Sequence, residues 1–393
     1  MRIALLTPAW PGSMTANGIA TTVVHLRDGL EACGHEVTII ALQIDAPHDD
    51  CRVIEVPSVR WTLLDKIRWR LGDDAVPYRV TAKQVLLAVQ EAERSIGVEV
   101  FVMEETQGWA RWLCGKVSIP VVVTLHCPRA LDSSLAADVR REAREAAALR
   151  VVQGVTAPSR DALDATRRIY GLSKVPLAVV PNPVPTQPEA KELSVDRAQL
   201  RKLLFVGRYD VTKGGDTVIE MFRRLAALES DCTLSFIGPD WGIFLPDGKM
   251  QGIDAHIATL PEGFRKRVTV LGQRSKAEIA ALRQRHGITV IASRYETFGY
   301  VMAEAMAIGS PIVCTQVGGP AEILKHEETA LLVPPEDPEA LADACKRLID
   351  DPALAIRLGH AAHDYATRHL SPAVVGRQMA DFLECVVNSF SKR

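Results

Sequence analysis

Several signatures of common protein classes are missing from this chain of 393 residues. Its eight cysteines form no C-x-x-C pair, which argues against a disulfide framework or a zinc site and favours reduced thiols. No apolar stretch reaches the roughly 20 residues that a membrane-spanning helix needs. Lys plus Arg total 46 and Asp plus Glu total 48, so bulk charge gives no attraction to nucleic acid. The opening run Met1–Leu6 is too short for the apolar region of a signal peptide, and we expect a cytoplasmic protein.

Two common nucleotide-binding motifs are also missing. Lys213 is not preceded by G-x-x-x-x-G, so the chain has no P-loop. No G-x-G-x-x-G occurs either, which weakens the case for a nicotinamide-dependent dehydrogenase.

The N-terminal half alternates short β-branched runs with helical patterns. Uniformly apolar runs such as Val121–Val123 suit parallel strands covered on both faces, and helices between such strands imply right-handed crossovers. The pattern predicts strands at Arg2–Thr7, Glu36–Ile40, Glu99–Met103 and Val121–Leu125, and helices at Ile19–Cys33 and Gln107–Lys116.

A proline-rich stretch, Pro181–Pro188, continues into polar residues up to Gln199 and predicts a linker. The alternation then restarts. It predicts strands at Leu203–Val206, Thr233–Ile237, Val268–Leu271, Ile288–Ala292, Ile312–Cys314 and Ala330–Val333, and helices at Asp216–Leu228, Lys276–Arg285 and Gly299–Ile308. We therefore expect an α/β protein of two doubly wound, Rossmann-like domains, residues 1–190 and 200–370, which face each other across a cleft. A last helix is expected at about 373–390. The sequence allows it to cross back to the first domain but does not require this.

Candidate binding groups concentrate around the helix expected to start near Gly299. The unpaired N–H groups of Phe298, Gly299 and Tyr300 would favour an anion at this helix start. Glu296 lies just before the helix and Glu304 lies on it, among small and apolar residues. A carboxylate there is costly to bury unless it is hydrogen-bonded, and a ribose or sugar diol would supply two donors. Read alone, two such glutamates are more often cap and surface residues.

A second cluster follows the apolar run Leu203–Val206. This run would deliver Arg208 to the carboxyl end of a strand, and Lys213 with two glycines precedes the next helix. Two cations beside a helix start are what a diphosphate requires, both for binding and for stabilising charge as it departs. A charged surface turn is the alternative interpretation.

A third cluster lies in the first domain. Asn17 and Gly18 open a helix, so their backbone amides would be able to approach a phosphate. His126 ends the strand Val121–Leu125 and is expected to point into the same cleft, although a lone histidine is more often structural.

Taken together, these segments resemble the retaining glycosyltransferases of the GT-B fold, specifically glycosyltransferase family 4. The resemblance covers nearly the whole chain. It rests on Asn17–Ala20, Gly34–Val37, His126, Val180–Pro183, Phe205–Arg208, Lys213–Gly214, the E-x7-E segment Glu296–Glu304, Gly309–Val313 and Gly318–Gly319.

The resemblance implies a role for each candidate residue. Arg208 and Lys213 would grip the diphosphate of a nucleotide-sugar donor, and Glu304 would bond the ribose hydroxyls. Glu296, with the amides of Phe298 and Gly299, would hold the donor sugar.

On the acceptor side, the resemblance implies that Gly18 lets the first domain's loop meet the phosphate or the sugar. His126 would lie against the transferred sugar. The acceptor would be a sugar, a lipid-linked molecule or a small molecule, and uridine, guanosine and adenosine all remain open as the base.

Glycosyl transfer needs stabilisation of the departing diphosphate and of an oxocarbenium-like sugar. Transferases that use a divalent cation generally carry a D-x-D triplet, and none occurs here, so we expect neither a metal nor another cofactor. Two alternatives stay open: a sugar-nucleotide epimerase or hydrolase of the same fold, and a non-catalytic bilobal binding protein.

One further segment, residues 60–71, combines an apolar helical face with basic residues and two tryptophans. Such a segment is able to lie on an anionic membrane or contact a lipid-linked acceptor, which would place the protein at the inner face of the membrane. A surface helix packed on the first domain is the simpler interpretation.

Overall fold

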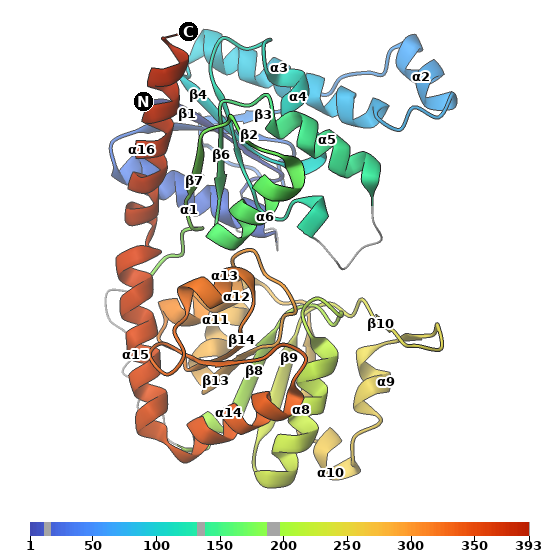
Figure 1. Ribbon diagram of the computed structural model, residues 1–393, viewed down its shortest axis with the longest axis vertical. Helices are drawn as coiled ribbons and strands as arrows, with labels where there is room; N and C mark the ends of the chain where they lie inside the picture. Colours follow the sequence, from blue (N-terminus) through green and yellow to red (C-terminus); the bar gives the residue numbers. More distant parts are fainter. Residues whose placement is uncertain (12–16, 132–137, 187–196, 393) are drawn as a thin grey trace. The chain divides into compact units, whose positions relative to one another are not determined.

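The computed structural model describes residues 1–11, 17–131, 138–186 and 197–392 (Figure 1). The chain divides into two compact units. One comprises Met1–Pro183 together with Pro372–Arg393, and the other comprises Val184–Ser371. Much of the expected linker, residues 187–196, lies outside the described residues.

The first unit is built on a sheet of seven strands in the order β3-β2-β1-β4-β5-β6-β7, and every described pairing in it is parallel. The strand order reverses between β1 and β4, which is where open α/β sheets bind ligands. The strands are β1 (Arg2–Thr7), β2 (Glu36–Ala41), β3 (Val53–Glu55), β4 (Val100–Glu104), β5 (Val121–Thr124), β6 (Gly154–Ala157) and β7 (Leu177–Val179).

Alternate residues of β1 enter two different cores because successive side chains of a strand point to opposite faces. Ile3 and Leu5 pack in one core with residues of α1 and α16, whereas Ala4 and Leu6 pack in the other. The helices of this unit are α1 (Gly18–Ala32), α2 (Leu63–Arg70), α3 (Val76–Ser95), η1 (Thr106–Gly108), α4 (Ala110–Leu113), η2 (Arg129–Leu131), α5 (Val139–Leu149), α6 (Arg160–Tyr170) and α16 (Pro372–Phe390).

The C-terminal helix α16 belongs to the first unit and packs against α1 (Figure 1). Its contact with α1 is close because Gly29 and Gly376 meet there. A Cβ added to Gly29 would lie 2.0 Å from the carbonyl oxygen of Pro372. Helix α2, by contrast, projects from the body of this unit, and none of its residues is buried (Figure 1).

The second unit has a sheet of six strands in the order β12-β9-β8-β13-β14-β15, again with parallel pairings. Its strands are β8 (Lys202–Val206), β9 (Thr233–Ile237), β12 (Val268–Gly272), β13 (Ile288–Ile291), β14 (Ile312–Thr315) and β15 (Leu331–Val333). A two-stranded antiparallel ribbon joins β10 (Ile243–Phe244) and β11 (Met250–Gln251).

Helices cover both faces of this second sheet. Val313 of β14 joins the core beneath α8 and α14, while its neighbours Ile312 and Cys314 join the core beneath α12 and α15. The helices are α7 (Arg197–Leu200), α8 (Gly215–Leu228), α9 (Ile253–Ile257), α10 (Glu262–Arg265), α11 (Lys276–Arg285), α12 (Tyr300–Ala307), α13 (Gly318–Ile323), α14 (Pro338–Asp350) and α15 (Pro352–His369).

The prediction of two doubly wound α/β halves is confirmed, and the predicted strands agree with the observed ones to within a residue or two at each end. The expected helix Gln107–Lys116 was wrong in extent, because a short turn η1 and the four-residue helix α4 occupy that span. The break follows from Gln107 and Gly108, whose φ values of 58° and 67° are left-handed and cannot continue a helix. Within the described residues, no helix combines the length and the apolarity required to cross a bilayer.

Candidate functional site

The carboxyl ends of β8 and β13 bring together a cation and a carboxylate that the sequence analysis singled out. Lys213 Nζ lies 2.5 Å from Glu296 Oε1, and the Ser293 hydroxyl donates to the same oxygen at 3.0 Å. Among the described residues, Glu296 Oε2 has no hydrogen-bond partner. The carboxylate therefore fixes Lys213 through one oxygen and leaves the other for a ligand.

Glycine at position 214 allows the Lys213 loop to approach the end of β13. Gly214 has a φ of 69° and forms the N-cap of α8. A Cβ there would lie 2.0 Å from the carbonyl oxygen of Ala292, so a side chain is excluded both by this contact and by the backbone conformation. This close approach places Lys213 beside Glu296.

Asp210 links the two predicted diphosphate-binding cations. Its Oδ2 accepts from Arg208 Nε at 2.6 Å, and its Oδ1 accepts from the Lys213 backbone N–H at 2.7 Å. The Arg208 guanidinium also stacks over the Trp241 ring, 4.0 Å from its centroid. Arg208 is thus oriented from two sides, and Asp210 holds the loop in register with it.

Arg294 joins the loop after β8 to the loop after β13. Its guanidinium binds both carboxylate oxygens of Asp216 in a bidentate pair at 3.0 and 2.8 Å, and it also donates to the Val211 carbonyl. The Arg294 backbone N–H donates to the Thr212 carbonyl at 2.8 Å. Hydrogen bonding to Asp216 raises the pKa of Arg294, which keeps its charge.

The start of α12 has the geometry expected for binding an anion or a polar ligand. Gly299 is its N-cap, with a φ of 86° and no side-chain cap. Within the described part of the chain, no hydrogen bond is assigned to the N–H groups of Phe298 and Gly299. The Phe298 ring is buried in the core and packs edge-on against Tyr300, with ring centroids 5.5 Å apart, so only its backbone is available to a ligand.

The surroundings of Glu304 differ from those predicted from the sequence. The sequence predicts a carboxylate on an apolar helix that needs a ribose to satisfy it. In the structure, Arg283 of α11 donates from Nη1 to Glu304 Oε2 at 2.6 Å. No described residue bonds Glu304 Oε1, and the side chain is 32% exposed, so one oxygen remains accessible.

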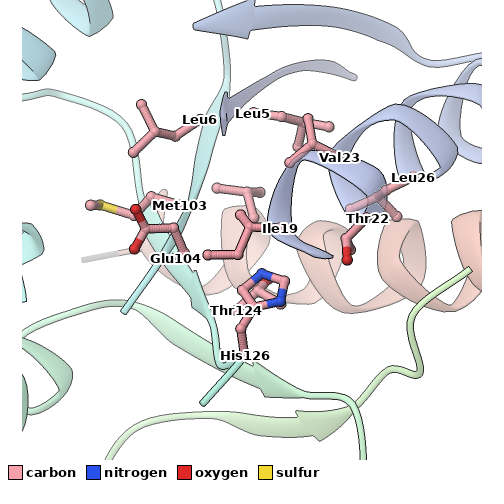
Figure 2. A pocket seen from close by; sticks show the side chains of 11 residues that line it. Leu5, Leu6, Ile19, Thr22, Val23, Leu26, Met103, Glu104, Thr124 and His126 are labelled. Carbon is pink, nitrogen blue, oxygen red and sulfur yellow. The ribbon is translucent and has the colours of Figure 1, made fainter. Parts of the chain in front are cut away.

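In the first unit, His126 lies in a pocket of about 300 Å³, solvent at its mouth included, at the strand-order reversal between β1 and β4. Ile19 and Thr22 reach the pocket from α1, Glu104 from the end of β4, and His126 from just beyond β5 (Figure 2). Residues near the start of α1 and His126 therefore line one pocket of the first unit.

Burial shifts both titratable groups of this pocket toward their neutral forms. Desolvation lowers the pKa of His126 to about 4. Desolvation also raises the pKa of Glu104 to about 7, against the hydrogen bond that its Oε2 accepts from the Thr106 N–H at 2.6 Å. Near neutral pH the pocket thus contains an uncharged imidazole and a carboxyl group close to its midpoint of titration.

Glu105, the next residue, orients His126 through the backbone. Its two carboxylate oxygens accept from the N–H groups of His126 at 2.9 Å and Cys127 at 2.8 Å. Glu105 is buried, and burial raises the pKa of its carboxyl group. The hydrogen bonds from the two N–H groups lower that pKa but have the smaller effect. Glu105 therefore anchors the loop that carries the histidine.

Asn17 uses its side chain to cap α1. Its Oδ1 accepts from the N–H of Ile19 at 2.8 Å and from that of Ala20 at 3.4 Å. Two of the amides at this helix start are therefore engaged by the chain itself. Residues 12–16 of the loop expected to precede the helix lie outside the described residues.

Five residues of these sites were not identified from the sequence: Asp210, Trp241, Arg283, Glu104 and Glu105. Asp210 lies between Arg208 and Lys213 in a segment already singled out. This position is the feature of the sequence that points to it. Arg283 carries no signal, because it is one of several basic residues in an ordinary helix. Glu104 and Glu105 come directly after the predicted strand Glu99–Met103, which is the position where functional side chains are expected in this fold.

Two known protein families match most of this chain. The model of the glycosyl transferases group 1 matches residues 187–365, and that of glycosyltransferase family 4 matches residues 16–188. A glycogen synthase of Mycobacterium tuberculosis is 25% identical over 387 residues, covering 93% of this chain and 90% of the relative.

Solved structures of similar fold include a sucrose-phosphate synthase of Thermosynechococcus elongatus. It aligns over 99% of both chains with a TM-score of 0.72 and 23% identity. Anabaena HepE, solved in complex with UDP and glucose, aligns over 97% of this chain and 99% of its own, with a TM-score of 0.67 and 18% identity.

The protein is a glycosyltransferase with the GT-B fold. The two family models together run from residue 16 to residue 365, and the chain belongs to the glycosyltransferases of the family 4 type.

Proposed function

We propose that this glycosyltransferase transfers a sugar, with retention of anomeric configuration and without a metal ion, from a nucleotide-diphosphate donor. The acceptor is a hydroxyl group of a sugar, a lipid-linked molecule or a small molecule in glycan or glycoconjugate biosynthesis. The observation that carries the proposal is the cluster at the ends of β8 and β13. There Lys213, Glu296 and the helix start at Gly299 lie together, with Arg208 on the same loop as Lys213.

In this proposal, the second unit binds the donor. Arg208 and Lys213 bind the diphosphate, and Glu296 Oε2 with the N–H groups of Phe298 and Gly299 binds the sugar. Glu304 Oε1 binds the ribose. Because HepE was solved with UDP and glucose, a UDP-sugar is the first donor to test, with GDP- and ADP-sugars beside it.

The reaction breaks the bond between the anomeric carbon and the β-phosphate oxygen and forms a new bond from that carbon to the acceptor oxygen. The two cations and the helix start stabilise the negative charge that develops on the departing diphosphate. We assign the acceptor's proton to that diphosphate, which leaves on the same face that the acceptor attacks. His126 and Gly18 of the first unit would contact the transferred sugar.

The direct test incubates the purified protein with UDP-, GDP- and ADP-sugars and a panel of sugar and polyol acceptors in the presence of EDTA. The proposal predicts a glycoside product whose anomeric configuration, read by NMR, equals that of the donor. Inversion, or activity that EDTA abolishes, would contradict the corresponding part of the proposal. Turnover of donor alone into an epimer would favour the epimerase alternative.

We also propose that α2 docks on an anionic lipid surface, where a lipid-linked acceptor would be met. Leu63, Leu64, Ile67, Trp69 and Leu71 are all large, apolar and exposed, at 74%, 54%, 44%, 49% and 81% respectively. The basic residues of the same segment, Arg60, Lys66, Arg68 and Arg70, are exposed as well. An apolar helical face bordered by basic side chains complements anionic headgroups above an apolar interior.

Sedimentation with vesicles tests this docking surface. Wild-type protein is expected to bind phosphatidylglycerol vesicles at low salt and to lose binding in Leu63→Asp/Ile67→Asp, whose side chains belong to α2. Phe244→Asp, at an apolar residue that is 70% exposed outside this helix, is the matched control and should bind normally. Absence of wild-type binding, or equal loss in the control, would reject the membrane proposal.

A further inference from the structure

Arg283 is buried, and within the described residues it forms an ion pair with Glu304. Its side chain is 4% exposed, and Nη1 donates to Glu304 Oε2 at 2.6 Å. Within the described residues, its buried Nε and Nη2 atoms have no hydrogen-bond partner. Glu304 is therefore the carboxylate that holds this guanidinium in place.

The same helix brings a second cation toward Glu304. Lys276, the first residue of α11, lies about two helical turns before Arg283, so both residues lie on one face of that helix. Burial lowers the pKa of Lys276, and the charge of Glu304 acts against this shift. Glu304 on α12 thus faces the positive side of α11.

The buried pair is a poor source of stability by itself. Burial of a guanidinium with two unpartnered nitrogens is costly, and replacing a buried ion pair by apolar groups is often neutral or stabilising. Its geometric effect is clear, however. The arginine engages one carboxylate oxygen, Oε2, and the other oxygen belongs to a side chain that is 32% exposed.

We propose that Arg283 is a positioning residue for donor recognition, which fixes the Glu304 carboxylate so that Oε1 is presented to the ribose hydroxyls of the nucleotide. This inference rests on the proposed function, since it takes Glu304 to be the ribose-binding group. Arg283 itself does not touch the nucleotide. It limits the rotamers of Glu304, and a carboxylate held in one orientation loses less entropy when it binds a diol.

Calorimetric titration with UDP, GDP and ADP tests the inference. The 2′-deoxy and 3′-deoxy forms of whichever nucleotide binds are then titrated in the same way. Wild-type protein is expected to prefer the ribonucleotide by about tenfold to a hundredfold, the effect of a hydrogen bond to a charged group. The Arg283→Met variant should lose most of this preference, because it binds the ribonucleotide more weakly. Its affinity for the deoxy forms should stay unchanged. Unchanged binding of the deoxy forms also shows that the variant is folded.

Two further variants separate positioning from a general structural effect. Glu304→Gln should remove the same preference, and Arg283→Met/Glu304→Gln should be no worse than Glu304→Gln alone, because the two residues act as one unit. Arg285→Met is the matched control, since Arg285 belongs to the same last turn of α11 but is exposed. It should keep the full preference.

The outcomes distinguish the inference from the proposed function. If Arg283→Met binds nucleotide and keeps the wild-type preference for ribose, the positioning role is overturned and the proposed function stands. If Glu304→Gln also keeps that preference, Glu304 does not bind the ribose and the inference fails with it. If wild-type protein binds none of the three diphosphates, the proposed function itself is overturned.

Discussion

Lys213 Nζ lies 2.5 Å from Glu296 Oε1, and this contact joins residues that are 83 positions apart in the sequence. It connects the loop after β8 to the loop after β13. Because Ser293 donates to the same oxygen, the ammonium group of Lys213 is held in a defined place. A phosphate that approaches this edge of the sheet would therefore meet a fixed cation.

Replacing either predicted diphosphate cation should reduce turnover strongly. We expect Arg208→Ala and Lys213→Ala each to lower kcat by about two to three orders of magnitude, the usual effect of losing one group that stabilises charge in the transition state. Lys202→Ala is the control, because Lys202 is exposed at the opposite, amino end of the same strand β8. Steady-state kinetics check this, and wild-type rates in either variant would contradict the phosphate assignment.

Asp210 should matter to both cations at once. Asp210→Ala removes the acceptor for Arg208 Nε and for the Lys213 N–H, so we expect the donor KM to rise about tenfold and stability to fall by about 2–3 kcal/mol. Asp254→Ala serves as the control, since Asp254 is exposed in the first turn of α9. Kinetics and urea denaturation measure the two effects, and an unchanged KM would show that Asp210 does not support the cations.

A methyl group at position 214 should disturb the site through the backbone. Gly214→Ala forces a side chain into a left-handed conformation and against the Ala292 carbonyl, so we expect a loss of about 2–4 kcal/mol in the free energy of unfolding. Gly263→Ala, where the added Cβ meets no described atom within 4 Å beyond its chain neighbours and its own helix, is the matched control and should change stability little. Equal stabilities of the two variants would contradict this account of the loop.

The two titratable groups of the first unit's pocket should affect stability with opposite signs. The pKa of Glu104 rises from 4.5 to about 7 on folding, so the folded protein binds more protons than the unfolded chain between these values, and stability falls as pH rises through them. The pKa of His126 falls from 6.5 to about 4, so its contribution to stability is lost as pH drops below 6.5.

Urea denaturation at several pH values separates these contributions. Relative to wild type, Glu104→Gln should gain up to about 3 kcal/mol of stability between pH 5 and pH 8, and His126→Gln should gain a similar amount between pH 6.5 and pH 4. A parallel pH dependence in wild type and either variant would show that the corresponding group titrates normally.

Much of the fold could be predicted because its determinants are local. Strands such as β5 and β9 are short apolar runs, and the start of α11 is marked by a capping box from Ser275 to Glu278. Helix α4 was predicted poorly, since the left-handed residues at Gln107 and Gly108 leave no clear trace in the sequence pattern.

The site could be predicted only where function requires a recognisable spacing. Lys213 and Glu296 were both identified from their segments, and the structure shows them in contact. Arg283 could not be found in this way, because its role depends on the packing of α11 against α12 rather than on any pattern within α11. Trp241 was missed for the same reason, as it meets Arg208 only after the chain folds.

The central claim, that Arg208 and Lys213 hold a diphosphate without a metal ion, is tested most directly by calorimetric comparison of nucleoside diphosphates with the matching monophosphates in EDTA. We predict that a diphosphate binds at least about tenfold more tightly than its monophosphate, and that Arg208→Ala/Lys213→Ala removes the difference. Equal affinities for the two nucleotides in wild-type protein, or a preference that persists in the double variant, would contradict it.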